Sequence, residues 1–259
     1  MFKYLLFNIS NKIATITLNR PEVYNACNDV ITYELQDALK ECEKNKEVRV
    51  AVLTGAGKAF CSGQDLKEAT ANPDRTFSES IHERYNPIIR AIRNMPKPVI
   101  CRLNGVAAGA GCSIVLACDM IIASEEASLI EIFVNIGLVP DSGSSYFLPR
   151  LIGYQKAFEV AAMGTKMTAV EGLQLGIINK VVKAEELDTA IDFYTNYFAN
   201  APTKAIGLMK KMMNKAMHSD LNTMLDYEAY CQDIAASTFD NKEGVAAFME
   251  KRKPQFKGE

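Results

Sequence analysis

The sequence predicts an α/β fold in which strands and helices alternate over about the first 150 residues and helices dominate afterwards. Tyr4–Ile9 and Ile13–Leu18 are short alternating runs around a polar turn, which is typical of a β-hairpin. Val48–Thr54 is apolar and rich in β-branched residues, as in a buried strand. After Gly137 the apolar residues recur mainly at helical spacing. The strand–strand–helix order repeats loosely, which favours a coil of ββα turns over a plain βαβ sandwich.

Further elements follow the hairpin in order. Asn28 is a candidate N-cap, because apolar residues recur at helical spacing after it. Another helix is expected from Ile81 to Ile92, bent at Pro87 because proline has no amide N–H to donate. The polar stretch Asn72–Arg75 before it is expected to be a mobile loop. The other expected elements are strands near 98–103, 120–123 and 127–130, a helix over Tyr154–Met163 ended by Gly164, a helix begun by the capping box Thr168–Glu171, and three or four helices through Lys251.

Composition excludes several classes of function. The 259 residues are 48% hydrophobic and 23% charged, with a net charge of −2, so neither nucleic acid nor an anionic membrane is an expected partner. Apolar runs fall short of the roughly 18–20 residues of a membrane span, and the start lacks the pattern of a signal peptide. The seven cysteines contain no Cys-x-x-Cys pair, which favours reduced thiols in a cytoplasmic protein. His82 and His218 lie far apart, so no metal site is expected.

Two glycine turns could bind a negatively charged oxygen. The first, Gly105–Gly111, follows an apolar strand and opens a buried helix, where free N–H groups carry the positive end of the helix dipole. A dinucleotide fingerprint would need a third glycine where Ile114 stands, and a P-loop would need Gly-Lys-Ser/Thr. The second turn, Ser62–Asp65, also follows an apolar segment. Together they could form an oxyanion hole, although either could equally be a packing turn, and spacing does not show that they meet.

Asp141 is the candidate base of the chain. It follows apolar residues and precedes a Ser/Gly turn, so it is either the N-cap of a helix or a partly desolvated carboxylate with a raised pKa. Ser113 lacks the final glycine of a Gly-x-Ser-x-Gly elbow and is not expected to be a nucleophile. Lys251–Lys253 is a solvated charged end or a phosphate contact. The methionines at 209, 212, 213 and 217 fall at helical spacing, as in a core or a subunit contact.

Several stretches, in order along nearly the whole chain, resemble the crotonase (enoyl-CoA hydratase/isomerase) superfamily. They are Asn19-Arg-Pro with Asn25-Ala26, Ala59-Phe-x-x-Gly63-x-Asp65-Leu66, Lys97-Pro-Val99 leading to Asn104-Gly-x-Ala-x-Gly109-x-Gly111, Gly137-Leu-Val-Pro140 and Phe248-x-x-Lys-Arg252-x-Pro254-x-Phe256. The resemblance implies a ββα spiral over residues 1–200, a C-terminal helical region over 201–259 that forms trimers or a dimer of trimers, and an acyl-CoA thioester substrate. Coenzyme A is then part of the substrate, and no separate cofactor is implied.

The resemblance also assigns roles to residues. The backbone N–H groups of Gln64 and Ala110 would form the oxyanion hole, although family members commonly have glycine where Ala110 stands. Lys251 matches a position that often reaches the CoA phosphates, sometimes those of a neighbouring subunit. The residues expected to bind the substrate are Val23, Ala26, Ser62, Gln64, Asp65, Leu66, Lys67, Ala110, Phe133 and Lys251.

Departures from the family pattern indicate the reaction. Hydratases of the family use two glutamates, which would stand where this chain has Ser113 and Phe133, while Glu131 lies two residues from the second place. Isomerases carry an acid after the proline of Gly-x-x-Pro, here Asp141. The sequence is similar to the branch that shifts double bonds in acyl-CoAs or opens a phenylacetyl-CoA ring epoxide to an oxepin. A hydratase that uses Glu131, a dehalogenase or ring-cleaving relative, and a non-catalytic acyl-CoA-binding protein remain alternatives.

Overall fold

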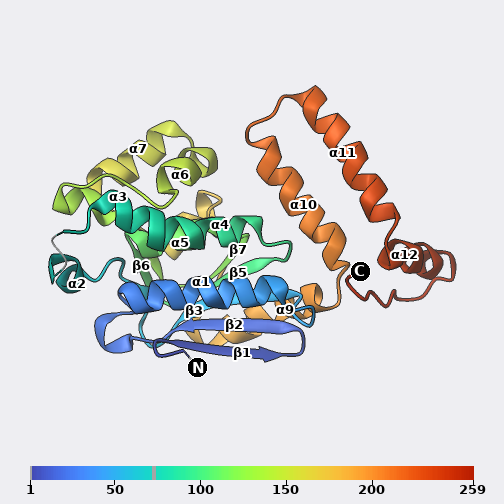
Figure 1. Cartoon of the computed structure of the whole chain (residues 1–259), viewed down its shortest axis with the longest axis horizontal. Helices are drawn as coiled ribbons and strands as arrows, with labels where there is room; N and C mark the ends of the chain where they lie inside the picture. The colour runs from blue at the N-terminus through green and yellow to red at the C-terminus, as the bar shows by residue number, and fades with distance from the viewer. Residues whose placement is uncertain (1, 72–73) are drawn as a thin grey trace.

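Two sheets form the centre of the molecule, as the computed structural model describes it for residues 2–71 and 74–259 (Figure 1). The larger sheet has the strand order β1-β2-β3-β5-β7-β10; its β1–β2 hairpin is antiparallel and the other pairs are parallel. The smaller sheet has the order β4-β6-β8-β9. The strands are β1 Leu5–Ser10, β2 Ile13–Leu18, β3 Val50–Gly55, β4 Ala59–Cys61, β5 Val99–Leu103, β6 Val106–Ala108, β7 Met120–Ser124, β8 Ser128–Ile130, β9 Lys166–Thr168 and β10 Lys180–Val182.

The expected ββα spiral is confirmed by how successive strands divide between the sheets. The pairs β3–β4, β5–β6 and β7–β8 each place one strand in the larger sheet and the next in the smaller one. One detail of the prediction is wrong: the chain does not turn directly from β5 into a helix. Val106–Ala108 forms β6, because its backbone pairs with β8, and the turn is confined to Gly109, whose φ is +52°. Helix α5, Ala110–Ala117, then begins at once and is wholly buried.

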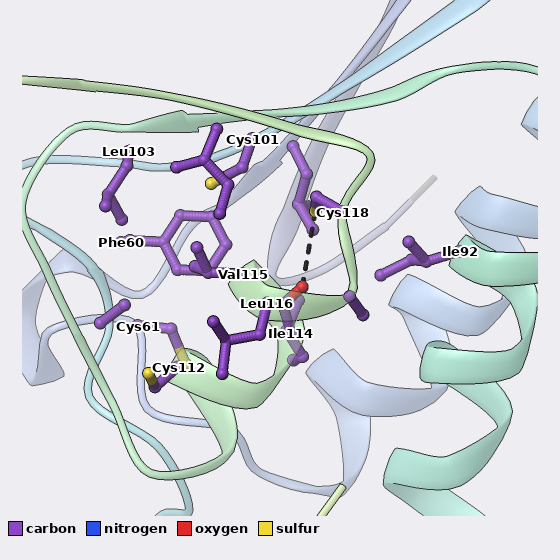
Figure 2. Close-up of a cluster of buried hydrophobic side chains, with 14 of the residues drawn as sticks. Phe60, Cys61, Ile92, Cys101, Leu103, Cys112, Ile114, Val115, Leu116 and Cys118 are labelled. Atoms are coloured by element: carbon purple, nitrogen blue, oxygen red, sulfur yellow. Dashed lines mark hydrogen bonds between the residues drawn. The ribbon is translucent and has the colours of Figure 1, made fainter. Parts of the chain in front are cut away.

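Helices cover both faces of the larger sheet. Alternate strand residues pack in two separate clusters: Ala51 and Leu53 lie on the side of helices α1 and α5, whereas Val50 and Val52 pack against α9. Figure 2 shows the ring of Phe60 in the first cluster, among Leu103, Cys101 and Val115. All seven cysteines are free and buried. The helices are α1 Asp29–Lys44, α2 Leu66–Ala71, α3 Phe77–Ser80, α4 Asn86–Asn94, α5 Ala110–Ala117, α6 Ser144–Ile152, α7 Tyr154–Met163, α8 Ala169–Gln174, α9 Leu187–Ala199, α10 Thr203–Ala216, α11 Leu221–Ala236 and α12 Phe239–Met249, with short turns η1 Pro21–Val23, η2 Ile81–Tyr85, η3 Ile132–Ile136 and η4 Ala184–Glu186.

Local end signals predicted several helix boundaries correctly. Asn28 caps α1 by accepting a hydrogen bond of 3.0 Å from the N–H of Ile31. Helix α7 ends at Gly164, whose φ is +57°, and Thr168 forms the expected capping box of α8. The helix that carries Pro87 is irregular just before it, because η2 is a wider π-helical turn between α3 and α4. Asn72 and Pro73 of the expected loop lie outside the described residues, so its mobility stays a prediction.

The last three helices, α10, α11 and α12, extend away from the sheets (Figure 1). Helix α10 is attached to the core through Lys210, whose Nζ lies 2.6 Å from Asp119 Oδ2. Met209, Met213 and Met217 are exposed, so these side chains are not core residues of this chain. A subunit contact remains the reading of this methionine stripe. Among residues 2–71 and 74–259, every helix is too short or too polar to cross a membrane.

Candidate active site

The two glycine turns meet in space. Gly63 has φ +96°, and a Cβ atom built there would lie 2.8 Å from the carbonyl oxygen of Ala108 and 3.6 Å from the amide nitrogen of Ala110. A Cβ atom at Gly111 would lie 2.4 Å from the carbonyl oxygen of Cys61. The backbones therefore touch directly, which only glycine permits at these points. The pairing of β4 with β6 brings the two turns together.

Two backbone donors face a common cavity at this contact. Ala110 is the first residue of α5, so its N–H has no partner within the helix. Among the hydrogen bonds of the described part of the chain, neither this N–H nor that of Gln64 donates to another group. Both residues line the same cavity, together with Gly63 and Gly109. The arrangement supplies two free N–H groups beside one space.

The cavity has a volume of about 430 Å³ and a mainly apolar wall. Phe133 is buried and stands over the first glycine turn: the Cζ atom of its ring would lie 3.9 Å from a Cβ atom at Gly109. A mainly apolar cavity of this size is typical of a small-molecule site. Its other apolar lining residues are Leu66, Phe77, Ile81, Ile132, Ile136 and Leu138.

Of the three carboxylates that line the cavity, two lie beside cations and one does not. Arg75 donates two hydrogen bonds of 2.6 and 2.8 Å to Asp29, and these hold the pKa of Asp29 below its usual value. Glu68 accepts a hydrogen bond from the Asp29 N–H and lies 3.9 Å from Arg84. Asp141 forms no ion pair with any described residue, and burial raises its pKa. Asp141 is therefore the cavity carboxylate best suited to accept a proton.

The N-cap reading of Asp141 is wrong. Helix α6 begins at Ser144, and its N-cap is Gly143, which provides no side chain. The Asp141 carboxylate instead accepts a hydrogen bond of 2.7 Å from the Ser142 hydroxyl, which partly offsets the effect of burial on its pKa. Ser142 and Gly143 both have positive φ, of 50° and 92°. This tight turn directs the carboxylate into the cavity instead of onto the helix end.

A second cavity adjoins the first and contains most of the residues expected to bind CoA. Its volume is about 550 Å³ and its opening is wider. Arg20 crosses one wall, 3.1 Å from the Asp65 carboxylate. Gln64, Leu66 and Glu68 line both cavities, so the two lie side by side at the second glycine turn and the start of α2. The expected residues found here are Val23, Ala26, Gln64, Asp65, Leu66 and Lys67, while Ser62 lines the first cavity.

Four other positions named from the sequence, Phe133, Ser113, Lys251 and Glu131, fall at different places. Phe133 lines the first cavity. Ser113, which stands at the other glutamate position of the hydratases, is fully buried and does not line it. Lys251 follows α12, across the molecule from α2 and β6 in Figure 1, and it lines neither cavity. The structure of one chain therefore does not bring Lys251 to the other predicted residues. Glu131 lines neither cavity and is only 1% exposed.

Sequence reasoning missed Tyr85. Its ring is buried in the wall of the first cavity, and its hydroxyl donates a hydrogen bond to the side-chain oxygen of Gln64. Burial raises the pKa of the Tyr85 phenol, which therefore stays protonated. The sequence marked Tyr85 only as an apolar helix position. Its partner Gln64 comes from a distant turn, so no local signal could have found the contact.

Comparison with known proteins identifies the family. Residues 8–259 match the family model described as enoyl-CoA hydratase/isomerase. The chain is 38% identical to the 1,2-epoxyphenylacetyl-CoA isomerase of Escherichia coli K12 over 100% of both chains, and 38% identical to a probable enoyl-CoA hydratase of Rhodobacter capsulatus over 97% of both. It is 36% identical to a trans-2-decenoyl-[acyl-carrier-protein] isomerase of Streptococcus mutans over 99% of both.

Solved structures agree with this identification. An enoyl-CoA hydratase from Bacillus anthracis superposes with a TM-score of 0.93 at 32% identity, covering 99% of this chain and 100% of that one. The two touching glycine turns, the unpaired carboxylate and the matched sequence thus lead to one conclusion: this chain belongs to the crotonase superfamily, as an enzyme of the enoyl-CoA hydratase/isomerase family.

Proposed function

We propose that the protein is an acyl-CoA isomerase that moves a double bond, or opens a ring epoxide to an oxepin, with Asp141 as its one proton-transferring carboxylate. The observation that carries the proposal is the position of Asp141. It lines an apolar cavity beside the free N–H groups of Gln64 and Ala110, without a cation among the described residues to hold it ionised. The relatives from Escherichia coli and Streptococcus mutans are named as isomerases, which supports the same reading.

In the proposed mechanism the thioester oxygen lies between the two N–H groups. Asp141 takes a proton from the carbon next to the thioester carbonyl, and negative charge develops on the oxygen as the proton leaves. The same carboxyl group then returns the proton to a more distant carbon, which completes the shift of the double bond. Because the charge is largest in the transition state, the two donors lower the barrier more than they tighten substrate binding. Removing one such donor typically costs about 3–4 kcal/mol.

The residues at the two hydratase positions argue against hydration. Adding water to a double bond takes two carboxylates to position and deprotonate the water, and here Ser113 and Phe133 occupy those places. Glu131 does not replace them, because it is buried outside both cavities and its Oε1 lies 2.9 Å from the Ser144 hydroxyl. Phe133 instead adds an aromatic wall beside Asp141.

Coenzyme A would occupy the second cavity, with its thioester arm entering at Gln64. Lys67 and Arg20 supply positive charge there, although Asp65 partly neutralises Arg20. Lys251 reaches this region only from another subunit, so its proposed contact with the CoA phosphates depends on assembly. The exposed apolar side chains of α10 and α12 would be covered in the proposed trimer or dimer of trimers. Exposed members are Met209, Met213, Phe239, Val245, Phe248 and Met249, with Met217 directly after α10.

The test compares three activities of the purified protein. We expect 3-enoyl-CoA to be converted to 2-enoyl-CoA at enzymatic rates, and crotonyl-CoA to be hydrated far more slowly. A medium-chain enoyl-CoA and a phenylacetyl-CoA ring epoxide would then rank the acyl groups. Fast hydration of crotonyl-CoA would contradict the proposal. So would tight binding of CoA esters without turnover of any of these substrates.

A further inference from the structure

A chain of buried polar side chains lies directly behind Asp141, and the reaction does not use it. The Glu131 Oε1 atom is 2.9 Å from Ser144 Oγ, which is 2.8 Å from Ser113 Oγ. Ser113 Oγ is in turn 3.0 Å from the carbonyl oxygen of Asp141. Glu131, Ser144 and Ser113 are each at most 1% exposed. We call these three residues the Glu131 chain.

The number of available protons links the direction of the hydrogen bonds in the Glu131 chain to the protonation of Glu131. Three oxygen–oxygen contacts in series need three protons, but the two serines supply only one each. All three contacts are hydrogen bonds at once only when Glu131 supplies the third proton, because a carbonyl oxygen can only accept. With Glu131 neutral, Glu131 donates to Ser144, Ser144 to Ser113, and Ser113 to the Asp141 carbonyl at 3.0 Å, which is nearer than its other acceptor, the Gly109 carbonyl at 3.3 Å. All three contacts are then satisfied in one direction.

Ionisation of Glu131 reverses the direction. The carboxylate can only accept, so Ser144 must turn its proton to Glu131 and Ser113 must turn its proton to Ser144. The Asp141 carbonyl then loses its donor from Ser113 and keeps only the N–H of Ser144, at 3.0 Å. The protonation of Glu131 thus decides whether the peptide that carries Asp141 is held by two donors or by one.

Burial and the negative charge of Asp141 favour the neutral form of Glu131, and hydrogen bonds from Cys112 and Ser144 partly oppose them. Burial raises the pKa of Glu131 to about 7. The titratable groups that face it are Cys112 on α5 and Asp141 ahead of α6. Burial keeps the Cys112 thiol protonated by raising its pKa, and the negative charge of Asp141 disfavours a second one nearby. Glu131 Oε2 has no N–H or O–H donor in the described chain and only the weakly donating Cys112 thiol nearby, which is costly for a carboxylate.

We infer that Glu131 is a positioning residue, whose proton holds Asp141 in place through Ser144 and Ser113 and whose ionisation loosens it. The inference rests on the proposed role of Asp141. A net hydrogen bond of this kind corresponds to a change of about two- to tenfold in rate. The rate should therefore rise with pH as Asp141 ionises and then fall by about two- to tenfold as Glu131 ionises around pH 7.

The experiment measures kcat for a 3-enoyl-CoA between about pH 5 and pH 9 in the wild type, Glu131→Gln and Ser144→Ala. The amide of Glu131→Gln keeps a permanent donor toward Ser144, so this variant should retain the high rate and lose the alkaline fall. Ser144→Ala should also lose the fall, because ionisation of Glu131 can then no longer draw the Ser113 proton away from the carbonyls of Asp141 and Gly109. If Glu131→Gln does not fold, Ser144→Ala carries the test. A wild type without the fall, or an unchanged fall in either folded variant, would overturn the inference.

An activity-independent measurement separates this inference from the proposed function. Infrared titration of the wild type should show the carbonyl stretch of a neutral carboxyl group that disappears around pH 7, and Glu131→Gln should lack it. Absence of that band would overturn the inference even if the enzyme is an isomerase. If the band is present but Asp141→Asn retains the wild-type rate, the role of Asp141 fails instead, and with it the positioning role of Glu131.

Discussion

Replacing Gly63 by alanine should abolish most of the activity while leaving a folded protein. Gly63 has φ +96°, which costs an L-residue about 1–3 kcal/mol. Its new Cβ atom would stand 2.8 Å from the Ala108 carbonyl oxygen, so the two turns must separate by about 0.6 Å to reach ordinary contact. An oxyanion donor has to lie about 2.7–3.1 Å from its oxygen. That separation therefore moves the N–H of Gln64 out of range.

The expected loss is about 100- to 1,000-fold in kcat, as when one oxyanion donor is removed, with KM little changed. Gly176→Ala is the matched control, because φ there is +78° and nothing lies within 4 Å of the added Cβ atom. Both variants place alanine at a positive φ, but only Gly63→Ala forces the two turns apart. The assay is steady-state isomerisation together with thermal unfolding of each variant. A Gly63→Ala enzyme within threefold of the wild-type kcat would refute the oxyanion role of Gln64.

Three further predictions concern buried polar groups. Because the pKa of Glu131 is raised to about 7, the wild type should lose stability as pH rises from the unfolded value of about 4.3 through 7. In urea unfolding, the free energy of unfolding of Glu131→Gln relative to that of the wild type should therefore rise between pH 5 and pH 8, by on the order of 3 kcal/mol. A difference that does not change with pH would contradict this. Tyr85→Phe removes the hydroxyl that holds the side chain of the second glycine turn, so kcat/KM should fall up to about tenfold, and an unchanged value would contradict it. Lys210→Met removes the 2.6 Å partner of the half-buried Asp119, which keeps Arg93 at 3.7 Å, and should cost about 1–3 kcal/mol in urea unfolding. Lys156→Met at the surface should cost under about 1 kcal/mol.

The sequence predicted best those features that depend on local signals. The Asn28 cap and the end of α7 at Gly164 depend on residues within one turn of the helix, so a short stretch of sequence was sufficient. Strand β6 was missed because its three residues form a strand only through pairing with β8. The N-cap reading of Asp141 failed for a similar reason, since the left-handed turn at Ser142 and Gly143 moves the helix start to Ser144.

The candidate site depends on contacts between distant segments, which spacing does not encode. That Gly63 touches Ala108 follows from strand pairing across 45 residues of sequence. Resemblance to the family named Gln64 and Ala110 as the two donors in advance, but it did not supply the strand pairing. It did not supply Tyr85 or the Glu131 chain, because those side chains meet through packing of several elements. Their proposed roles depend on side-chain hydrogen bonds that only the three-dimensional structure shows.

The central claim is that Asp141 alone carries the proton. The most direct measurement is isomerisation of a 3-enoyl-CoA in deuterated water by the wild type and by Asp141→Asn, with acyl-CoA binding measured in parallel. Asparagine keeps the size of the side chain but cannot accept the proton. We predict unchanged binding, with loss of both isomerisation and deuterium exchange. An Asp141→Asn enzyme that isomerises and exchanges at nearly the wild-type rate would contradict the account.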